Sequence, residues 1–308
     1  MRHHNNIEFM STAIDAKTGL AVLIGHPVEH SLSPLFMNYA MQRLELNCRY
    51  LAFDTKPDCL GDTIASMRTL GLKGINITIP HKNEAPKYVD DLDSDARKIG
   101  AVNCIYRKGE HLIGTNTDHS GFIHPLKERG YELNAIEVLL IGCGGAARGV
   151  VYALWNEGVR IIHLINRTRE NAQKFITWCN KSLQDLDIAY IGNLRSIQNK
   201  ATPECRLVIN TTPVGMYPAS DDCPLPEEFR LHKGQVVYDL VYNPETTMLL
   251  QRARNDGADV INGLPMLILQ GIYSLSLWFP QKKDKIISLS NPVLEYTKRY
   301  FKGDREHG

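Results

Sequence analysis

The stretch VLLIGCGGAARG, Val138 to Gly149, decides the fold predicted for this chain. Four apolar residues, Val138 to Ile141, run directly into glycines and then into a helix-forming segment, which is typical of a buried parallel strand turning into a helix. Gly142 permits the tight turn, Gly144 lets the backbone approach a phosphate, and Ala147 allows the helix to pack closely on the strand. Because the helix N-terminus then faces an anion, the stretch predicts a dinucleotide site.

A second strand, Arg160 to Ile165, follows at the spacing of a strand–helix–strand unit and ends in Asn166, Arg167 and Thr168. Residues at this position read the adenosine ribose of a dinucleotide. An acidic residue there would repel a 2′-phosphate, whereas a basic residue admits one. Arg167 therefore favours NADP(H) as the cofactor.

The composition limits the class of protein. A chain of 308 residues predicts two domains, and a formal charge of +1 argues against a nucleic-acid partner. The seven cysteines include no C-x-x-C pair, which is typical of reduced thiols and not of a disulfide framework or a zinc site. The first ten residues lack the apolar core of a secretory signal, and no apolar run approaches the roughly 20 residues of a membrane helix. We expect a cytoplasmic protein with no metal and no membrane contact.

The first half alternates apolar strands (20–25, 48–53) with helices (35–46, 59–70), which predicts an α/β domain with a mainly parallel sheet. Ser31 and Ser33 lie in the turn before the first of these helices. Hydroxyls in such a turn either cap the backbone N–H groups of the helix or hold a polyol, and the turn alone leaves both readings open.

Short polar side chains gather where the strands of this half end. In GINITIPHK, Gly74 to Lys82, three isoleucines at 75, 77 and 79 alternate with Asn76 and Thr78, and Pro80 ends the strand. GAVN ends in Asn103 and follows an acidic helix expected from about residue 90, and GTNTDHSGF carries Asp118 into the next helix. Because strand ends of an α/β sheet line one crevice, these polar groups are expected to lie together.

The second half continues the dinucleotide domain with strands at 206–212 and 235–240. The second of these predicts Tyr238, Asp239 and Tyr242 at the carboxyl edge of the sheet. A long apolar helix at 266–279 has no partner in its own domain. We expect it to return, with a tail helix near 291–301, to the first domain.

These strings, in this order, resemble the shikimate dehydrogenase family, which includes the quinate/shikimate enzymes. The family pattern S-x-S-P is matched by Ser31, Ser33 and Pro34, N-x-T-x-P-x-K by Asn76, Thr78, Pro80 and Lys82, and G-A-V-N by Asn103. N-T-D-x-x-G is matched by Asp118 and Gly121, G-x-G-G-A by Gly142, Cys143, Gly144, Gly145 and Ala146, and G-x-x-M-x-x-x-Q by Gly263, Met266 and Gln270.

The resemblance implies a two-domain α/β fold. A substrate domain would occupy residues 17–118 and be completed by 264–308, and a Rossmann-like NADP-binding domain would occupy 119–263. The implied activity is the NADPH-dependent, reversible reduction of 3-dehydroshikimate to shikimate in aromatic amino acid biosynthesis, by a monomer or a homodimer.

The same resemblance assigns roles to individual residues. Lys82 and Asp118 match the catalytic pair. Substrate would be bound by Ser31, Ser33, Asn76, Thr78, Asn103, Tyr242 and Gln270. The cofactor would contact the glycine-rich turn from Gly142 to Ala146, then Asn166, Arg167, Thr168 and Arg169, and also Leu240, Gly263 and Met266. The family's further basic residue, three past the threonine, is Asn171 here, and Arg169 is the expected substitute.

The chemistry of the residues agrees with these roles. Hydride addition to a ketone leaves an alkoxide, which the Lys82 ammonium can stabilise and protonate, while Asp118 fixes the ammonium. No metal is needed, and the histidines show no ligand spacing. Two other interpretations stay open. One is a quinate/shikimate enzyme or a paralogue for another ring acid, which the presence of Ser31 disfavours. The other is a dinucleotide-sensing module without turnover, which the presence of both Lys82 and Asp118 disfavours.

Overall fold

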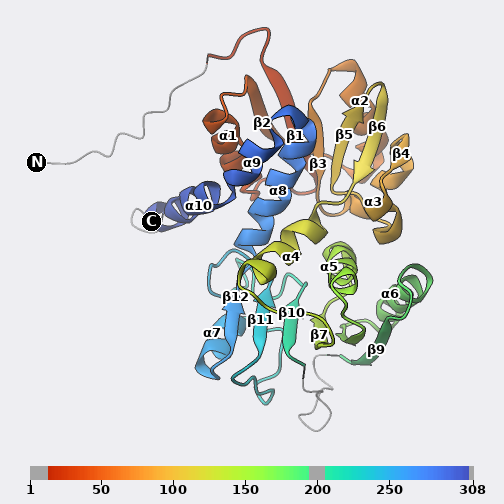
Figure 1. Cartoon of the computed structure of the whole chain (residues 1–308), viewed down its shortest axis with the longest axis vertical. Helices are drawn as coiled ribbons and strands as arrows, with labels where there is room; N and C mark the ends of the chain where they lie inside the picture. Colours follow the sequence, from red (N-terminus) through yellow and green to blue (C-terminus); the bar gives the residue numbers. More distant parts are fainter. Residues whose placement is uncertain (1–12, 194–204, 305–308) are drawn as a thin grey trace, which may run out of the picture.

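The computed structural model describes residues 13–193 and 205–304, with side chains as far as residue 300. The first ten residues, which were considered for a targeting signal, lie outside this part. The described chain forms two six-stranded sheets, one above the other in Figure 1. Residues 19–115 build the first sheet and residues 137–261 the second.

The first sheet has the spatial order β2-β1-β3-β5-β6-β4. Its strands are β1 (Gly19–Gly25), β2 (Cys48–Asp54), β3 (Gly74–Ile77), β4 (Asp91–Leu92), β5 (Cys104–Lys108) and β6 (His111–Thr115). Strands β2, β1 and β3 are parallel, as predicted, but β5 runs antiparallel to β3 and to β6. The start of β5 and the ends of β3 and β6 therefore meet at one edge.

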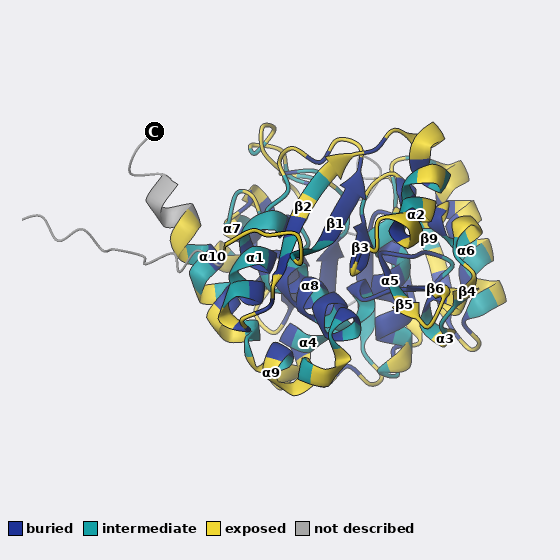
Figure 2. Cartoon of the chain, turned by 90° about the horizontal axis from the view of Figure 1, so that it is seen from above, coloured by how far each residue is buried: buried dark blue, intermediate teal, exposed yellow. Residues whose placement is uncertain are grey.

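Helices cover both faces of this sheet. Helix α1 (Ser33–Arg43) packs on one face and α2 (Leu60–Thr69) with α3 (Ser94–Ile99) on the other. Short 3-10 turns complete the half: η1 (Pro57–Cys59), η2 (His81–Asn83) and η3 (Ala85–Tyr88). Figure 2 shows the contrast between the buried strand β1 and the partly exposed edge strand β2.

The second sheet is parallel throughout, in the order β12-β11-β10-β7-β8-β9. Its strands are β7 (Glu137–Ile141), β8 (Ile161–Ile165), β9 (Asp187–Gly192), β10 (Leu207–Asn210), β11 (Val236–Asp239) and β12 (Asp259–Ile261), and its helices are α5 (Gly145–Asn156), α6 (Arg169–Ser182) and α7 (Met248–Asn255). After β9 the chain returns to the other side of β7. This reversal opens a crevice at the carboxyl ends of β7 and β10, where α/β sheets bind ligands.

Two helices join the halves (Figure 1). Helix α4 (Asp118–Glu128) packs against α5 of the second half and against α8 (Leu264–Trp278), which continues into the core of the first. A Cβ on Gly121 would lie 2.8 Å from a backbone oxygen of α8, so only glycine permits this close crossing of α4 and α8. The chain then continues through η5 (Pro280–Lys282), α9 (Lys283–Ser288) and α10 (Ser290–Asp304). The predicted return of the C-terminal helices to the first half is confirmed, since buried residues of α8, α9 and α10 share its core.

Three local expectations are wrong. The acidic helix begins at Ser94 and not near residue 90, because the Asp93 carboxylate accepts the N–H of Ala96 at 2.8 Å and caps the helix there. Strand β3 ends at Ile77, so Ile79 does not join its apolar face and is 72% exposed. Tyr238 lies inside β11 and stacks on Phe122 with ring centroids 4.9 Å apart, away from the edge where it was expected.

A membrane span is absent from the described residues, where no helix combines sufficient length with sufficient apolar character.

Candidate active site

Lys82 and Asp118 form an ion pair at the shared edge of the first sheet. Lys82 lies in η2, which follows β3, and Asp118 is the first residue of α4. The Lys82 Nζ donates to Asp118 Oδ2 at 2.7 Å, and the side chains are 16% and 5% exposed. A carboxylate in the first turn of a helix is stabilised by the helix dipole, so the start of α4 suits a charged Asp118.

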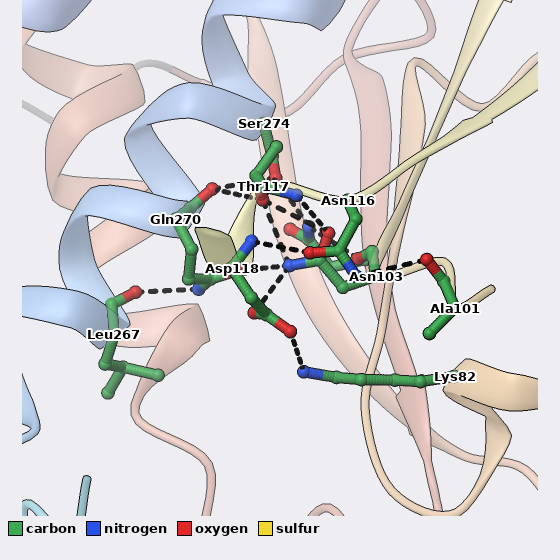
Figure 3. Close-up of polar contacts among 10 residues, drawn as sticks. Lys82, Ala101, Asn103, Asn116, Thr117, Asp118, Leu267, Gln270 and Ser274 are labelled. Atoms are coloured by element: carbon green, nitrogen blue, oxygen red, sulfur yellow. Dashed lines mark hydrogen bonds and ion pairs between the residues drawn. The ribbon is translucent and has the colours of Figure 1, made fainter. Parts of the chain in front are cut away.

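A second residue holds the other oxygen of Asp118. Asn103 Nδ2 donates to Asp118 Oδ1 at 2.7 Å, and Asn103 Oδ1 accepts the backbone N–H of Thr117 at 2.7 Å. The Asn116 side chain also accepts the N–H of Asp118, at 3.1 Å. Figure 3 shows these contacts converging on Asp118, with Lys82 approaching from the opposite side. Both carboxylate oxygens are therefore fixed by the protein.

Asn76 lies beneath this cluster and is 4% exposed. Its amide donates to Ser274 Oγ at 2.8 Å and to the carbonyl of Asn103 at 3.2 Å, and its oxygen accepts the hydroxyl of Tyr50 at 2.9 Å. These contacts use both ends of the Asn76 amide within the protein. Its place in the structure is that of a support for the Asn103 backbone.

The other predicted substrate residues come from several elements around the pair. Ser33 is the first residue of α1 and donates its N–H to Ser31 Oγ at 3.2 Å, although the N-cap residue itself is Leu32, which makes no side-chain cap. Gln270 on α8 has its Oε1 3.4 Å from Asn103 Nδ2. Tyr242, which follows β11 in the second half, packs against the core of the first half, and burial raises its pKa above the usual value. Thr78 is half-buried just past the end of β3.

A pocket of 460 Å³ lies at the carboxyl ends of β7, β8 and β10. The predicted turn residues Gly142, Cys143 and Gly144 line it. Gly142 has φ +96°, and a Cβ there would lie 2.6 Å from Thr212, so this tight turn requires glycine. Gly144 is the N-cap of α5, whose free N–H groups favour an anion. The pocket fits the pyrophosphate of a dinucleotide.

The pocket extends to the end of β8. Asn166, Arg167 and Thr168 line it as predicted, together with Asn171 and Lys174 of α6. Arg169 is exposed and does not belong to this lining, and neither do Gly145, Ala146, Leu240, Gly263 and Met266 among the described residues. Lys174 lies one helical turn beyond Asn171 on α6, so the helical spacing of the sequence could have indicated it.

Residues that follow β10 form a further wall of the pocket, from Thr211 to Val214. A buried network below them was not anticipated, although the polar strand ends in INTT and YDL signal it. Asp239 is fully buried and accepts hydrogen bonds from Asn210 Nδ2 at 2.9 Å, from the N–H of Val241 at 3.0 Å and from Thr247 Oγ1 at 2.6 Å. Burial raises the pKa of Asp239 to about 6, although the three hydrogen bonds act in the opposite direction.

The two sites adjoin each other. A Cβ on Gly145 of the phosphate loop would lie 3.9 Å from the Cβ of Lys82, and Asn83 lines the cofactor pocket. A dinucleotide site thus lies next to an ion pair of a lysine and a carboxylate. This fold and this site define a two-domain oxidoreductase that uses a nicotinamide dinucleotide on a small polar substrate.

Comparisons with known proteins identify the family. The family described as "Shikimate dehydrogenase substrate binding domain" matches residues 23–105, and "Shikimate / quinate 5-dehydrogenase" matches residues 126–197. The NADP⁺-dependent shikimate dehydrogenase of Moorella thermoacetica is 42% identical over 268 residues, 86% of this chain and 89% of that protein. The chain belongs to the shikimate dehydrogenase family.

Solved structures agree with this assignment. Shikimate 5-dehydrogenase of Listeria monocytogenes, in complex with shikimate and NAD, has a TM-score of 0.80 and 32% identity, over 90% of this chain and 97% of that one. The enzyme of Thermus thermophilus, in complex with NADP(H) and shikimate, has a TM-score of 0.73 and 32% identity, over 88% and 99% of the two chains. The two-domain fold expected from the resemblance is confirmed.

Proposed function

We propose that the chain catalyses the reversible, NADPH-dependent reduction of 3-dehydroshikimate to shikimate. The observation that carries this proposal is the 2.7 Å ion pair between Lys82 and Asp118, beside the cofactor loop. A ketone carbon placed between the pair and the cofactor pocket can face the cofactor while its oxygen faces the Lys82 ammonium. The names of the relatives and of the solved complexes support the same substrate and cofactor.

NADPH supplies the hydride when bound. The Lys82 ammonium donates a hydrogen bond to the ketone oxygen, and as negative charge builds on that oxygen it transfers a proton from Nζ. In the reverse direction Lys82 takes the hydroxyl proton. Asp118 holds Nζ in place, and Asn103 together with the start of α4 holds Asp118. This arrangement needs no movement of the carboxylate during the reaction.

The substrate ring is assigned to five residues: Ser31, Ser33, Thr78, Tyr242 and Gln270. Gln270 lies next to the ion pair through Asn103, and Ser31 adds a hydroxyl just before α1. Asn76 and Asn103 were expected to bind substrate directly, and we assign them mainly to support of the pair. The substrate domain would comprise 17–118 and 264–308 and the cofactor domain 119–263, in agreement with the two sheets.

NADP is proposed as the preferred cofactor because Arg167 and Lys174 place two positive charges at the ribose end of the pocket. Arginine binds phosphate by charge-assisted, bidentate hydrogen bonds. Lys174 can fulfil the role that the sequence gave to Arg169, since it lines the pocket. Gly145, Ala146, Leu240, Gly263 and Met266 remain predicted cofactor contacts.

A double-mutant cycle tests the catalytic assignment. Lys82→Ala should lower kcat for shikimate oxidation at least 100-fold, because a positioned acid or base contributes about 10²–10⁴-fold. Asp118→Asn should also be severely impaired. If the two residues act as one unit, the double variant should lose little more than the worse single variant. A loss equal to the product of the two single losses would show independent action and contradict the paired mechanism.

Lys87→Ala is the matched control, since Lys87 forms an exposed ion pair with Glu84 only five residues along the chain from Lys82. Its kcat should equal that of the wild type. Initial rates with shikimate and quinate, each with NADP and NAD, separate the proposed activity from the quinate/shikimate alternative.

A cytoplasmic location is supported by the seven cysteines, all of them free thiols. We expect a monomer or a homodimer, which sedimentation will distinguish.

A further inference from the structure

Three metal-binding side chains lie together on the second sheet, outside the active site. They are Glu137, the first residue of β7, His163 in the middle of β8, and Cys205, two residues before β10. One donor atom from each lies within 4.8 Å of the others, and no other such group occurs in the described part of the chain. Because β10, β7 and β8 are neighbours in the sheet, the donors lie on two adjacent strands and just before a third.

The surroundings make this group unusual. His163 interrupts the apolar strand IIHLI, and Cys205 is 2% exposed within a core that also contains Leu139 and Ile165. The Glu137 side chain is 39% exposed and that of His163 18% exposed. The Glu137 carboxylate is therefore open to solvent, whereas the Cys205 sulfur is buried. An ion could enter at the carboxylate and bind in a shielded position beside the sulfur.

The donors already have part of the required arrangement. His163 Nε2 lies 2.8 Å from Glu137 Oε2, so the imidazole and the carboxylate face the same point. Around a tetrahedral zinc ion, with bonds of about 2.0–2.3 Å, ligand atoms lie roughly 3.4–3.6 Å apart. To bind an ion, the His–Glu pair would open slightly and the sulfur would move closer to it.

We propose that Glu137, His163 and Cys205 form a zinc site with a fourth position open to water. An imidazole with a thiolate favours zinc over magnesium or calcium, which prefer oxygen ligands. On binding, the Cys205 thiol releases its proton to solvent and the sulfur bonds to the metal. The metal would join three strands whose opposite ends carry the cofactor pocket, so its role is to stabilise the cofactor domain and not to take part in the reaction.

The test uses the full chain, stripped of metal with EDTA and titrated with CoCl₂ or ZnCl₂. Cobalt should give the near-ultraviolet charge-transfer band of a thiolate complex, saturating at one equivalent per chain. Zinc in large excess over its dissociation constant should raise Tm by several degrees, because a ligand that binds only the folded state stabilises it. Shikimate oxidation should be the same with and without EDTA.

Two variants locate the site, and one is a control. Cys205→Ser should abolish the charge-transfer band, and His163→Ala should weaken cobalt binding at least tenfold. Cys59→Ser removes an exposed thiol on η1 and should behave as the wild type. The proposal is overturned if the wild type shows no thiolate band. It is equally overturned if zinc raises the Tm of the wild type and of His163→Ala by the same amount.

Discussion

Replacing Asp239 by asparagine should change how the stability of the protein depends on pH. The Asp239 carboxyl is fully buried, and burial raises its pKa to about 6 from the ordinary 3.8. Asparagine has nearly the same shape and can accept the N–H of Val241, but it cannot ionise. A comparison of the two proteins therefore isolates the charge on one side chain.

The sign and the size follow from the two pKa values. A carboxyl whose pKa is higher in the folded state stabilises the fold below pH 3.8 and loses that contribution as pH rises through about 6. The difference between the folded and unfolded pKa values of Asp239 corresponds to about 3 kcal/mol over the whole titration, since each pKa unit is worth about 1.4 kcal/mol. The unfolded carboxyl is already more than half ionised at pH 4, so the free energy of unfolding of Asp239→Asn, minus that of the wild type, should increase by about 2 kcal/mol between pH 4 and pH 7.

Urea unfolding followed by tryptophan fluorescence measures this difference, and Trp155 and Trp178 report on the domain that holds Asp239. Groups that titrate in both proteins cancel in the subtraction. Asp221→Asn, at an exposed position, is the control and should give a difference that does not vary with pH. A flat difference for Asp239→Asn, or one that decreases with pH, would refute the reasoning.

Five further substitutions test the cofactor pocket, the substrate site and the crossing of α4 and α8. Lys174→Ala should raise KM for NADP about tenfold and leave KM for NAD unchanged, whereas Arg169→Ala should change neither, because only Lys174 lines the pocket. Ser33→Ala should raise KM for shikimate without a change in KM for NADP, as initial rates will show. Ser31→Ala should lower the free energy of unfolding by about 0.5–1.5 kcal/mol in urea titrations, because it removes the hydrogen bond that the Ser31 hydroxyl accepts from the Ser33 N–H. Gly121→Ala should lower both Tm and kcat, because its methyl group would meet the backbone of α8 at 2.8 Å.

Structural features that depend on residues close together along the chain were the ones best predicted from the sequence. The turn from β7 into α5 follows from the apolar run and the glycines after it, and Gly142 adopts the positive φ that such a turn needs. The gathering of Lys82, Asn103 and Asp118 at one edge was also predicted. It occurs for a partly different reason, since the antiparallel β5 starts at that edge, where a parallel strand would end.

How deeply each polar side chain of the site is buried could not be predicted in the same way. Asn76 and Asn103 have the same polar character as Thr78, yet they are 4% and 1% exposed and bind other protein groups. Whether a polar side chain faces ligand or protein depends on which element covers it, and here that element is α8, nearly 200 residues away from Asn76. Asp239 was expected at the carboxyl edge of the second sheet, but its burial was not predicted, for the same reason, because its partners Asn210 and Thr247 come from separate elements.

The packing of α4 explains why the catalytic pair is asymmetric. Asp118 begins a helix that is clamped between α5 and α8, and both of its oxygens have donors fixed by the fold. Lys82 lies on a short 3-10 turn, and its ammonium is held by Asp118 alone among the described residues. Because the carboxylate is fixed and the ammonium is carried by a flexible side chain, Nζ can follow the ketone oxygen as charge develops on it. The geometry therefore supports the proposed division of roles, in which Asp118 holds the ammonium in position and Lys82 transfers the proton.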